Sequence, residues 1–151
     1  SCVVSGYGTS VGAHTLTALA TDVAGNTASE QRTYTVEGWT LVGFTPPVAM
    51  GEDVWNDVKA GSTVPLKFEV FAGAVELTDT DVVASYGATP TVCPGDTSVV
   101  GDRLGKSTLR YDRETGQFVI TWRAPKTRGA CFLYTVTTVD GSSLTANFRL
   151  F

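Results

Sequence analysis

The sequence has only one histidine among its 151 residues. A nucleophilic serine or cysteine needs a neighbouring base. His14 would have to be that base. It lies in a strand-like segment, where we expect it to face solvent or to pack beside Tyr34. We therefore predict that the chain is not an enzyme.

Basic charge is also scarce, since 11 Lys and Arg residues oppose 15 Asp and Glu residues and give a net charge of −4. Nucleic-acid binding needs clustered Lys and Arg to contact phosphates, so we predict no nucleic-acid partner. No run approaches the roughly 18 apolar residues of a membrane helix, and we predict no membrane insertion. The start, Ser1-Cys2-Val3-Val4, does not resemble a secretion signal. We expect that a leader was removed or that the chain begins inside a longer polypeptide.

Only three cysteines are present, and two of them lie in strand-like segments late in the chain. If Cys93 and Cys131 form a disulfide, the cross-link would stabilise the fold by roughly 3–4 kcal/mol through the lost entropy of the unfolded chain. Cys2 would then lack a partner, which suggests a partner before Ser1 and an extracellular setting. The alternative is three reduced, buried thiols in a cytosolic protein.

What the sequence does contain is the composition of a folded β-protein, 42% hydrophobic and 17% charged with 16 glycines. Its central stretch is residues 60–71, Ala-Gly-Ser-Thr-Val-Pro-Leu-Lys-Phe-Glu-Val-Phe. Apolar side chains recur there at every second position: Val64, Leu66, Phe68 and Val70. This period of two predicts a strand with one buried face.

Similar segments follow at a spacing of about ten residues, with turn signals such as Asp140-Gly141 between them. The predicted strands are 2–5, 14–21, 30–36, 39–44, 64–71, 75–77, 80–86, 106–111, 117–122, 131–138 and 143–150. We expect residues 48–59 to form a loop. The first three strands are too few to bury a core alone, whereas the others predict a β-sandwich of about seven to nine strands.

Three short motifs lie in the first quarter of the chain. They read Gly12-x-His-Thr-Leu-Thr-Ala18, Ala20-Thr-Asp-x-Ala-Gly-Asn26 and Tyr34-Thr-Val36. Together they resemble the C-terminal half of a bacterial Ig-like repeat, in which a cysteine often stands at the position of Cys2. The first half of such a repeat is absent. We therefore predict that residues 1–37 are an incomplete Ig-like unit, completed in a longer polypeptide or by another chain.

A second set of motifs spans nearly all of the remaining sequence. The matching segments are Trp55-Asn56, Val58 to Phe68 (Val-Lys-Ala-Gly-Ser-Thr-Val-Pro-x-Lys-Phe), Leu109-Arg-Tyr-Asp112, Gly116-Gln-Phe118, Trp122, Cys131 and Asp140-Gly-Ser-Ser143. They resemble the PxKF domain, found at the C-terminus of many secreted actinobacterial proteins. The resemblance implies an extracellular location, a sandwich fold and neighbouring modules, but no particular activity. We predict an all-β protein, with an Ig-like β-sandwich at 38–151 after the incomplete unit.

Aromatic side chains are the candidate binding residues, because β-sandwiches commonly bind glycans by stacking sugar rings on them. A sugar-binding platform needs at least two aromatic side chains exposed on one face. We predict that Trp55 forms such a platform with Tyr86 or Tyr111. Trp55 lies in a predicted loop, where it could be exposed or could plug one end of the sandwich. Trp122 follows Phe118 at even spacing, so we expect it in the core.

Acidic residues form small groups in predicted turns. Asp22 with Asn26, and Asp79 with Asp81, could bind calcium through their oxygens, or they could be solvated turn residues. None has EF-hand spacing, so we predict no cofactor, with calcium as the alternative. The acids of residues 52–57 share one loop, which does not by itself form the cleft of a glycosidase.

These observations favour a non-catalytic structural or spacer module at the C-terminus of a secreted multidomain bacterial protein. Its partners would be the upstream domains of the same polypeptide. One alternative is an accessory module of a secreted hydrolase that binds polysaccharide or cell wall. Another is a strand-exchanging subunit of a filament or adhesin, because an incomplete sheet exposes unpaired edges.

Overall fold

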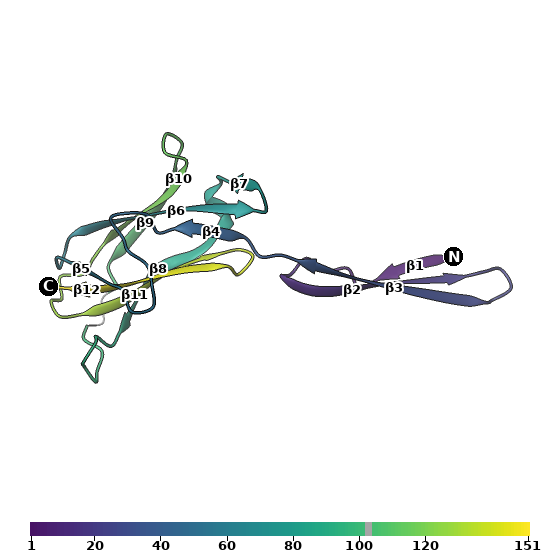
Figure 1. The fold of residues 1–151 in the computed structure, drawn as a ribbon, viewed down its shortest axis with the longest axis horizontal. Coiled ribbons are helices and arrows are strands. Elements are labelled where there is room, and N and C mark those ends of the chain that lie inside the picture. The colour runs from purple at the N-terminus through teal and green to yellow at the C-terminus, as the bar shows by residue number, and fades with distance from the viewer. Residues whose placement is uncertain (102–103) are drawn as a thin grey trace. The chain divides into compact units, whose positions relative to one another are not determined.

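The computed structural model describes residues 1–101 and 104–151 and shows an all-β protein. The chain divides into two compact units, Ser1–Gly38 and Trp39–Phe151 (Figure 1). Apart from a single 3₁₀ turn, the regular structure of the described residues is made of strands. The same residues contain no helix with the length and apolar character needed to cross a membrane.

The first unit is a three-stranded antiparallel sheet in the order β1 (Cys2–Ser5), β2 (Gly12–Thr21) and β3 (Thr27–Val36). The β2–β3 hairpin is in register from Gly12 opposite Val36 to Thr21 opposite Thr27. None of residues 1–38 is fully buried. The unit therefore lacks a core of its own, and among the described residues no further strand pairs with the outer edges of β1 and β3.

The second unit is a sandwich of two sheets. One has the order β4 (Thr40–Gly43), β6 (Thr63–Ala72), β10 (Gln117–Arg123) and β9 (Lys106–Asp112), with β7 (Val75–Leu77) also pairing with β6. The other has the order β5 (Trp55–Val58), β12 (Ser143–Leu150), β11 (Cys131–Thr138) and β8 (Val83–Thr91). All pairings are antiparallel except that of β5 with β12.

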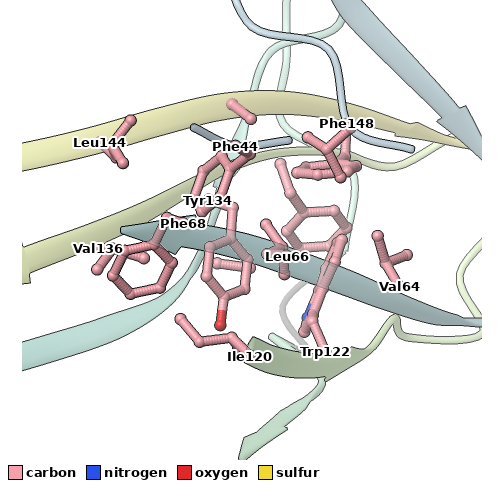
Figure 2. Close-up of a cluster of buried hydrophobic side chains, with 14 of the residues drawn as sticks. Phe44, Val64, Leu66, Phe68, Ile120, Trp122, Tyr134, Val136, Leu144 and Phe148 are labelled. Atoms are coloured by element: carbon pink, nitrogen blue, oxygen red, sulfur yellow. The ribbon is translucent and has the colours of Figure 1, made fainter. Parts of the chain in front are cut away.

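The core lies between the two sheets (Figure 2). Strand β6 contributes its predicted alternate row, and all four side chains of that row are buried: Val64, Leu66, Phe68 and Val70. Trp122 on β10 has no exposed surface and packs against three rings of the opposite sheet, those of Phe132, Tyr134 and Phe148. Its predicted core position is therefore confirmed.

Two predicted elements are wrong. The expected loop at 48–59 contains strand β5, which pairs in parallel from Trp55 opposite Asn147 to Val58 opposite Leu150. The expected strand at 80–86 begins as a 3₁₀ turn, Thr80–Val82, and β8 starts only at Val83. The reason is local, because the Asp79 carboxylate accepts a hydrogen bond from the Asp81 N–H and so caps the turn.

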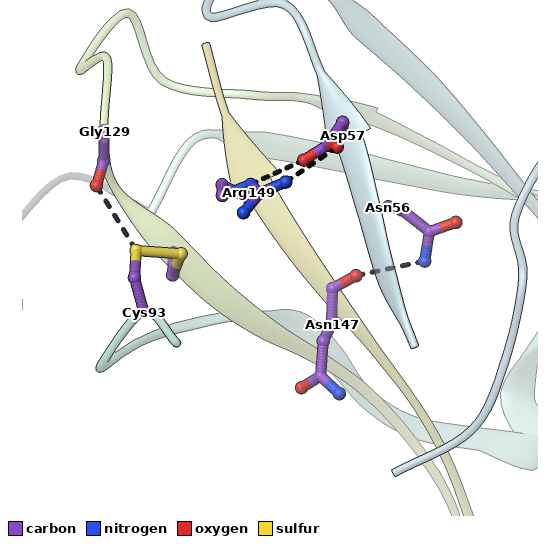
Figure 3. Close-up of polar contacts among 7 residues, drawn as sticks. Asn56, Asp57, Cys93, Gly129, Asn147 and Arg149 are labelled. Atoms are coloured by element: carbon purple, nitrogen blue, oxygen red, sulfur yellow. Dashed lines mark hydrogen bonds and ion pairs between the residues drawn. A yellow bond between two sulfur atoms is a disulfide. The ribbon is translucent and has the colours of Figure 1, made fainter. Parts of the chain in front are cut away.

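The predicted disulfide between Cys93 and Cys131 is confirmed, with the two Cα atoms 5.3 Å apart (Figure 3). It joins the segment after β8 to the first residue of β11. Both cysteines are buried, whereas Cys2 is an exposed free cysteine. The cross-link therefore closes a loop that contains strands β9 and β10.

A carboxylate fastens the start of the sandwich to the β11–β12 turn. Asp140 accepts hydrogen bonds from the Trp39 N–H at 2.6 Å, the Thr138 hydroxyl at 2.5 Å, and both the N–H and the hydroxyl of Ser142 at 3.1 and 2.8 Å. Burial alone would raise the pKa of this group, but the four donors outweigh it and lower the pKa from 3.8 to about 2.

This network predicts a loss of stability in acid. The folded pKa of Asp140 lies below its unfolded value, so its contribution is present above about pH 4 and disappears as the pH falls toward 2. Because Asp140 is partly exposed, we expect a contribution of about 1–2 kcal/mol, less than the full pKa shift implies. Urea unfolding at pH 7 and pH 2.5 should show this loss, and Asp140→Asn should reduce it. An unchanged pH dependence in Asp140→Asn would contradict the assignment.

Candidate functional site

The candidate site predicted around Trp55 is a groove at one open side of the sandwich. It has a volume of about 430 Å³ and lies where edge strand β5 of one sheet meets β6 of the other. Its lining residues are Pro47, Val48, Trp55, Asn56, Asp57, Val58, Lys59, Ser62, Thr63, Val64, Pro65 and Phe148. The lining thus combines two aromatic residues, Trp55 and Phe148, with polar, charged and small apolar residues.

Asn56 holds the loop that borders this groove. Its side-chain oxygen accepts from the Ala49 N–H at 2.8 Å, and its amide group donates to the Ala49 carbonyl at 2.9 Å. The same amide donates to the Asn147 carbonyl on β12 at 3.0 Å (Figure 3). One side chain therefore ties the 45–51 segment to the four-stranded sheet and gives the groove a fixed border.

Asp57 and Arg149 form an ion pair on neighbouring strands beside the groove (Figure 3). The Arg149 Nε and one terminal nitrogen donate to the two Asp57 oxygens at 2.7 and 2.9 Å. These hydrogen bonds lower the pKa of Asp57 and raise the pKa of Arg149. Because Arg149 occupies both oxygens of this carboxylate, Asp57 serves to attach β5 to β12.

The three predicted glycan-binding aromatics do not share one surface. Trp55 is half-buried on β5, and Tyr86 lies on β8, so they occupy opposite edges of the four-stranded sheet. Tyr111 belongs to β9 in the other sheet, where it packs edge-on against Phe118 and donates from its hydroxyl to Glu76 at 2.8 Å. Trp55 lines the groove described above.

The predicted calcium-binding residues act within their turns. Asp22 accepts from the N–H groups of Ala24 and Asn26 at 2.8 and 2.9 Å and from the Asn26 side-chain amide at 2.8 Å. These bonds, led by that of the Asn26 side chain, lower the pKa of Asp22. In the described part of the chain, no group of three or more His, Cys, Asp or Glu side chains is placed to hold a metal ion.

His14 packs on Tyr34 with the ring centroids 5.3 Å apart, as predicted. Its Nε2 lies 2.6 Å from the Ser10 carbonyl oxygen and 3.4 Å from the Ser10 hydroxyl. The shorter contact requires a proton on Nε2, because a carbonyl oxygen only accepts. This nitrogen therefore donates to the main chain and does not act as a base toward Ser10.

Sequence reasoning missed a second groove, which has a volume of about 660 Å³. Its lining residues are Gly61, Leu104, Gly105, Lys106, Arg123, Ala124, Pro125, Lys126 and Thr127. Three of these nine are cationic, in a chain of net charge −4. The β9–β10 pairing places Lys106 directly opposite Arg123. The sequence predicts a hairpin at 106–122, and extending its register by one residue would have indicated that these two cations are neighbours.

Searches against protein-family models and against curated proteins found no match to this chain. The structure defines a class, an all-β sandwich with one buried disulfide. The resemblances to an Ig-like repeat and to the PxKF domain therefore rest on the motifs quoted above.

Proposed function

We propose that this chain is a non-catalytic structural module of a secreted multidomain protein, serving to space, cap and stabilise its neighbours. The observation that carries the proposal is the buried Cys93–Cys131 disulfide in a sandwich that also has a buried hydrophobic core. Disulfides persist in oxidising compartments, which supports an extracellular setting. A rigid sandwich of this kind suits a spacer because it resists local opening and proteolysis.

The test uses the polypeptide in which this chain occurs, with and without residues 39–151. A structural module predicts unchanged kcat/KM of any upstream enzyme on a soluble substrate, together with a shorter half-life under protease when the module is deleted. Incubation of the isolated chain with polysaccharide and ester substrates should give no turnover. Measurable turnover by the isolated chain, abolished by denaturation, would overturn the proposal.

A second candidate function is binding of a neutral glycan in the Trp55 groove. The groove volume of about 430 Å³ suits a small ligand, and an aromatic wall flanked by polar groups is the usual composition of such a site. Removing a stacking tryptophan should reduce binding by up to about tenfold, because aromatic stacking contributes about 0.5–1.5 kcal/mol beyond the buried area.

Retention on insoluble polysaccharide tests this function. Trp55→Ala should weaken retention by up to about tenfold, whereas Tyr86→Ala at the opposite edge of the same sheet should leave it unchanged. Thermal melts of both variants would show that the sandwich stays folded. Failure of the unmodified chain to bind any wall or plant polysaccharide would remove this candidate, as would equal losses in the two variants.

A further inference from the structure

The cationic groove lies at the end of the β9–β10 hairpin where β10 leaves the sheet, and its walls are fixed by main-chain contacts. The Gly61 N–H donates to the Pro125 carbonyl at 2.8 Å, and the Ala124 N–H donates to the Ser62 carbonyl at 2.9 Å. Ala124 and Pro125 are buried beneath the surface of the groove. The turn before β6 and the segment after β10 therefore form one preformed wall.

The opposite wall is attached to the core through Trp122. The Trp122 indole N–H donates to the Leu104 carbonyl at 3.0 Å. A Cβ at position 105 would lie 2.3 Å from the Arg123 carbonyl oxygen, so only glycine allows this close approach. The segment of Leu104 and Gly105 is thus held against β10, and the groove needs no rearrangement to form.

Three cations surround this preformed space. Lys106 and Arg123 are directly opposite each other in the antiparallel ladder, and their side chains extend from the same face of the sheet. The stem of Lys126 passes beside Gly61, whose α-carbon leaves room for it: a Cβ there would lie 3.2 Å from the Lys126 Cγ. All three side chains are exposed.

Among the lining residues that the structure describes, none carries a carboxylate that could pair with these cations. The ion pairs of the described residues are Arg32 with Glu30, Arg110 with Asp112 and Arg149 with Asp57. Like charges placed directly opposite on neighbouring strands destabilise a sheet, so Lys106 beside Arg123 has a cost in the free protein. An anion bound between them would remove that cost and gain charge-assisted hydrogen bonds.

We propose that this groove binds an anionic sugar, with its carboxylate or phosphate between Lys106 and Arg123 and its ring over the apolar floor of Ala124 and Pro125. The volume of about 660 Å³ accommodates one or two sugar units. The net charge of −4 disfavours a long polyanion such as a nucleic acid, because the many phosphates that extend beyond the groove would be repelled. The site shares no described lining residue with the Trp55 groove, so the two proposals can be tested independently of each other.

Calorimetric or NMR titration of the full chain at low salt tests the proposal. The probes are trigalacturonate, glucose 6-phosphate, inorganic phosphate, neutral maltotriose and a short single-stranded DNA. We expect saturable binding of trigalacturonate or of glucose 6-phosphate, which separates the carboxylate from the phosphate, and weaker binding of inorganic phosphate, which lacks the ring. Maltotriose should not bind this groove. Raising the salt concentration should weaken binding, since the charges are exposed.

The test variants are Lys106→Gln and Arg123→Gln, and the matched control is Arg110→Gln, which removes the same charge from β9 outside the groove. Each test variant should weaken binding by about tenfold, whereas the control should change it less than about twofold. Without ligand, each test variant should also melt about 1–3 °C higher at low salt, because the opposed charges are relieved.

Several outcomes would overturn the proposal. These are the absence of saturable binding of both anionic sugars, maltotriose binding of equal strength that Arg123→Gln weakens, or an equal loss in Arg110→Gln. DNA binding tighter than that of both anionic sugars would indicate a polyanion surface instead. Anionic-sugar binding that is lost in Trp55→Ala but retained in Arg123→Gln would assign the sugar to the other groove.

Discussion

Replacing Trp122 with alanine should lower the free energy of unfolding by about 4 kcal/mol, the largest effect we expect from a single substitution. Trp122 has no exposed surface, and its ring centroid lies 5.9 Å from Phe132, 5.4 Å from Tyr134 and 5.1 Å from Phe148. The surrounding rings belong to two paired strands, so they cannot collapse into the space that is left. The Leu104 carbonyl would also lose its hydrogen bond.

Equilibrium unfolding in guanidinium chloride measures this effect, and the transition should report on residues 39–151 because no residue of the first unit is fully buried. Trp122→Phe is an intermediate variant, because it keeps an aromatic ring but loses the indole N–H. It should lower the free energy of unfolding by clearly less than Trp122→Ala does. Trp55→Ala is the matched control on a half-buried tryptophan at a sheet edge. A loss for Trp122→Ala no greater than that for Trp55→Ala would contradict the central role of this ring.

The core was predictable where the local pattern and the buried face coincide. Strand β6 is covered on one face by the opposite sheet, so buried apolar side chains recur at every second position, and Val64, Leu66, Phe68 and Val70 could be assigned to the core. Trp122 could be placed in the same way, because Phe118 and Ile120 precede it at even spacing. In both strands the periodicity results from the burial of one face.

Strand β5 could not be predicted, because its four residues have no alternating pattern. Its pairing with β12 is parallel and joins segments far apart in the chain, and Asn56 and Asp57 stabilise it through Asn147 and Arg149. These contacts exist only in the folded sandwich. Trp55 was therefore expected in a loop, whereas the structure places it on an edge strand where it lines a groove.

The cationic groove was predictable only in part. The connection 112–116 ends in a glycine with positive φ and indicates a hairpin, and extending the register of that hairpin places Lys106 opposite Arg123. Lys126 and Gly61 come together through loops whose conformation depends on main-chain bonds between distant segments. The overall net charge of −4 also concealed this local cluster, because a sum over the chain carries no information on position.

Removing the disulfide with the double variant Cys93→Ala/Cys131→Ala should lower the free energy of unfolding by about 4 kcal/mol. The bond joins residues separated by 38 positions, and opening it increases the entropy of the unfolded chain. Both cysteines are buried, so alanine at these positions also loses packing contacts. Because β9 and β10 lie inside the closed loop, we expect their amide hydrogens to exchange faster in the double variant.

Guanidinium chloride unfolding with and without a reducing agent isolates the role of the cross-link. Reduction should destabilise the unmodified chain by somewhat less than the double substitution, which also loses packing contacts, and should have no further effect on the double variant. Cys2→Ser provides the matched control, since this cysteine is exposed and forms no disulfide in this chain; it should leave the unfolding curve unchanged. If reduction shifts the double variant as much as the unmodified chain, the stabilisation does not come from the Cys93–Cys131 bond. If the double variant instead keeps its full stability, the sandwich is held by its core alone, and the disulfide contributes nothing to the rigidity that the proposed spacer role requires.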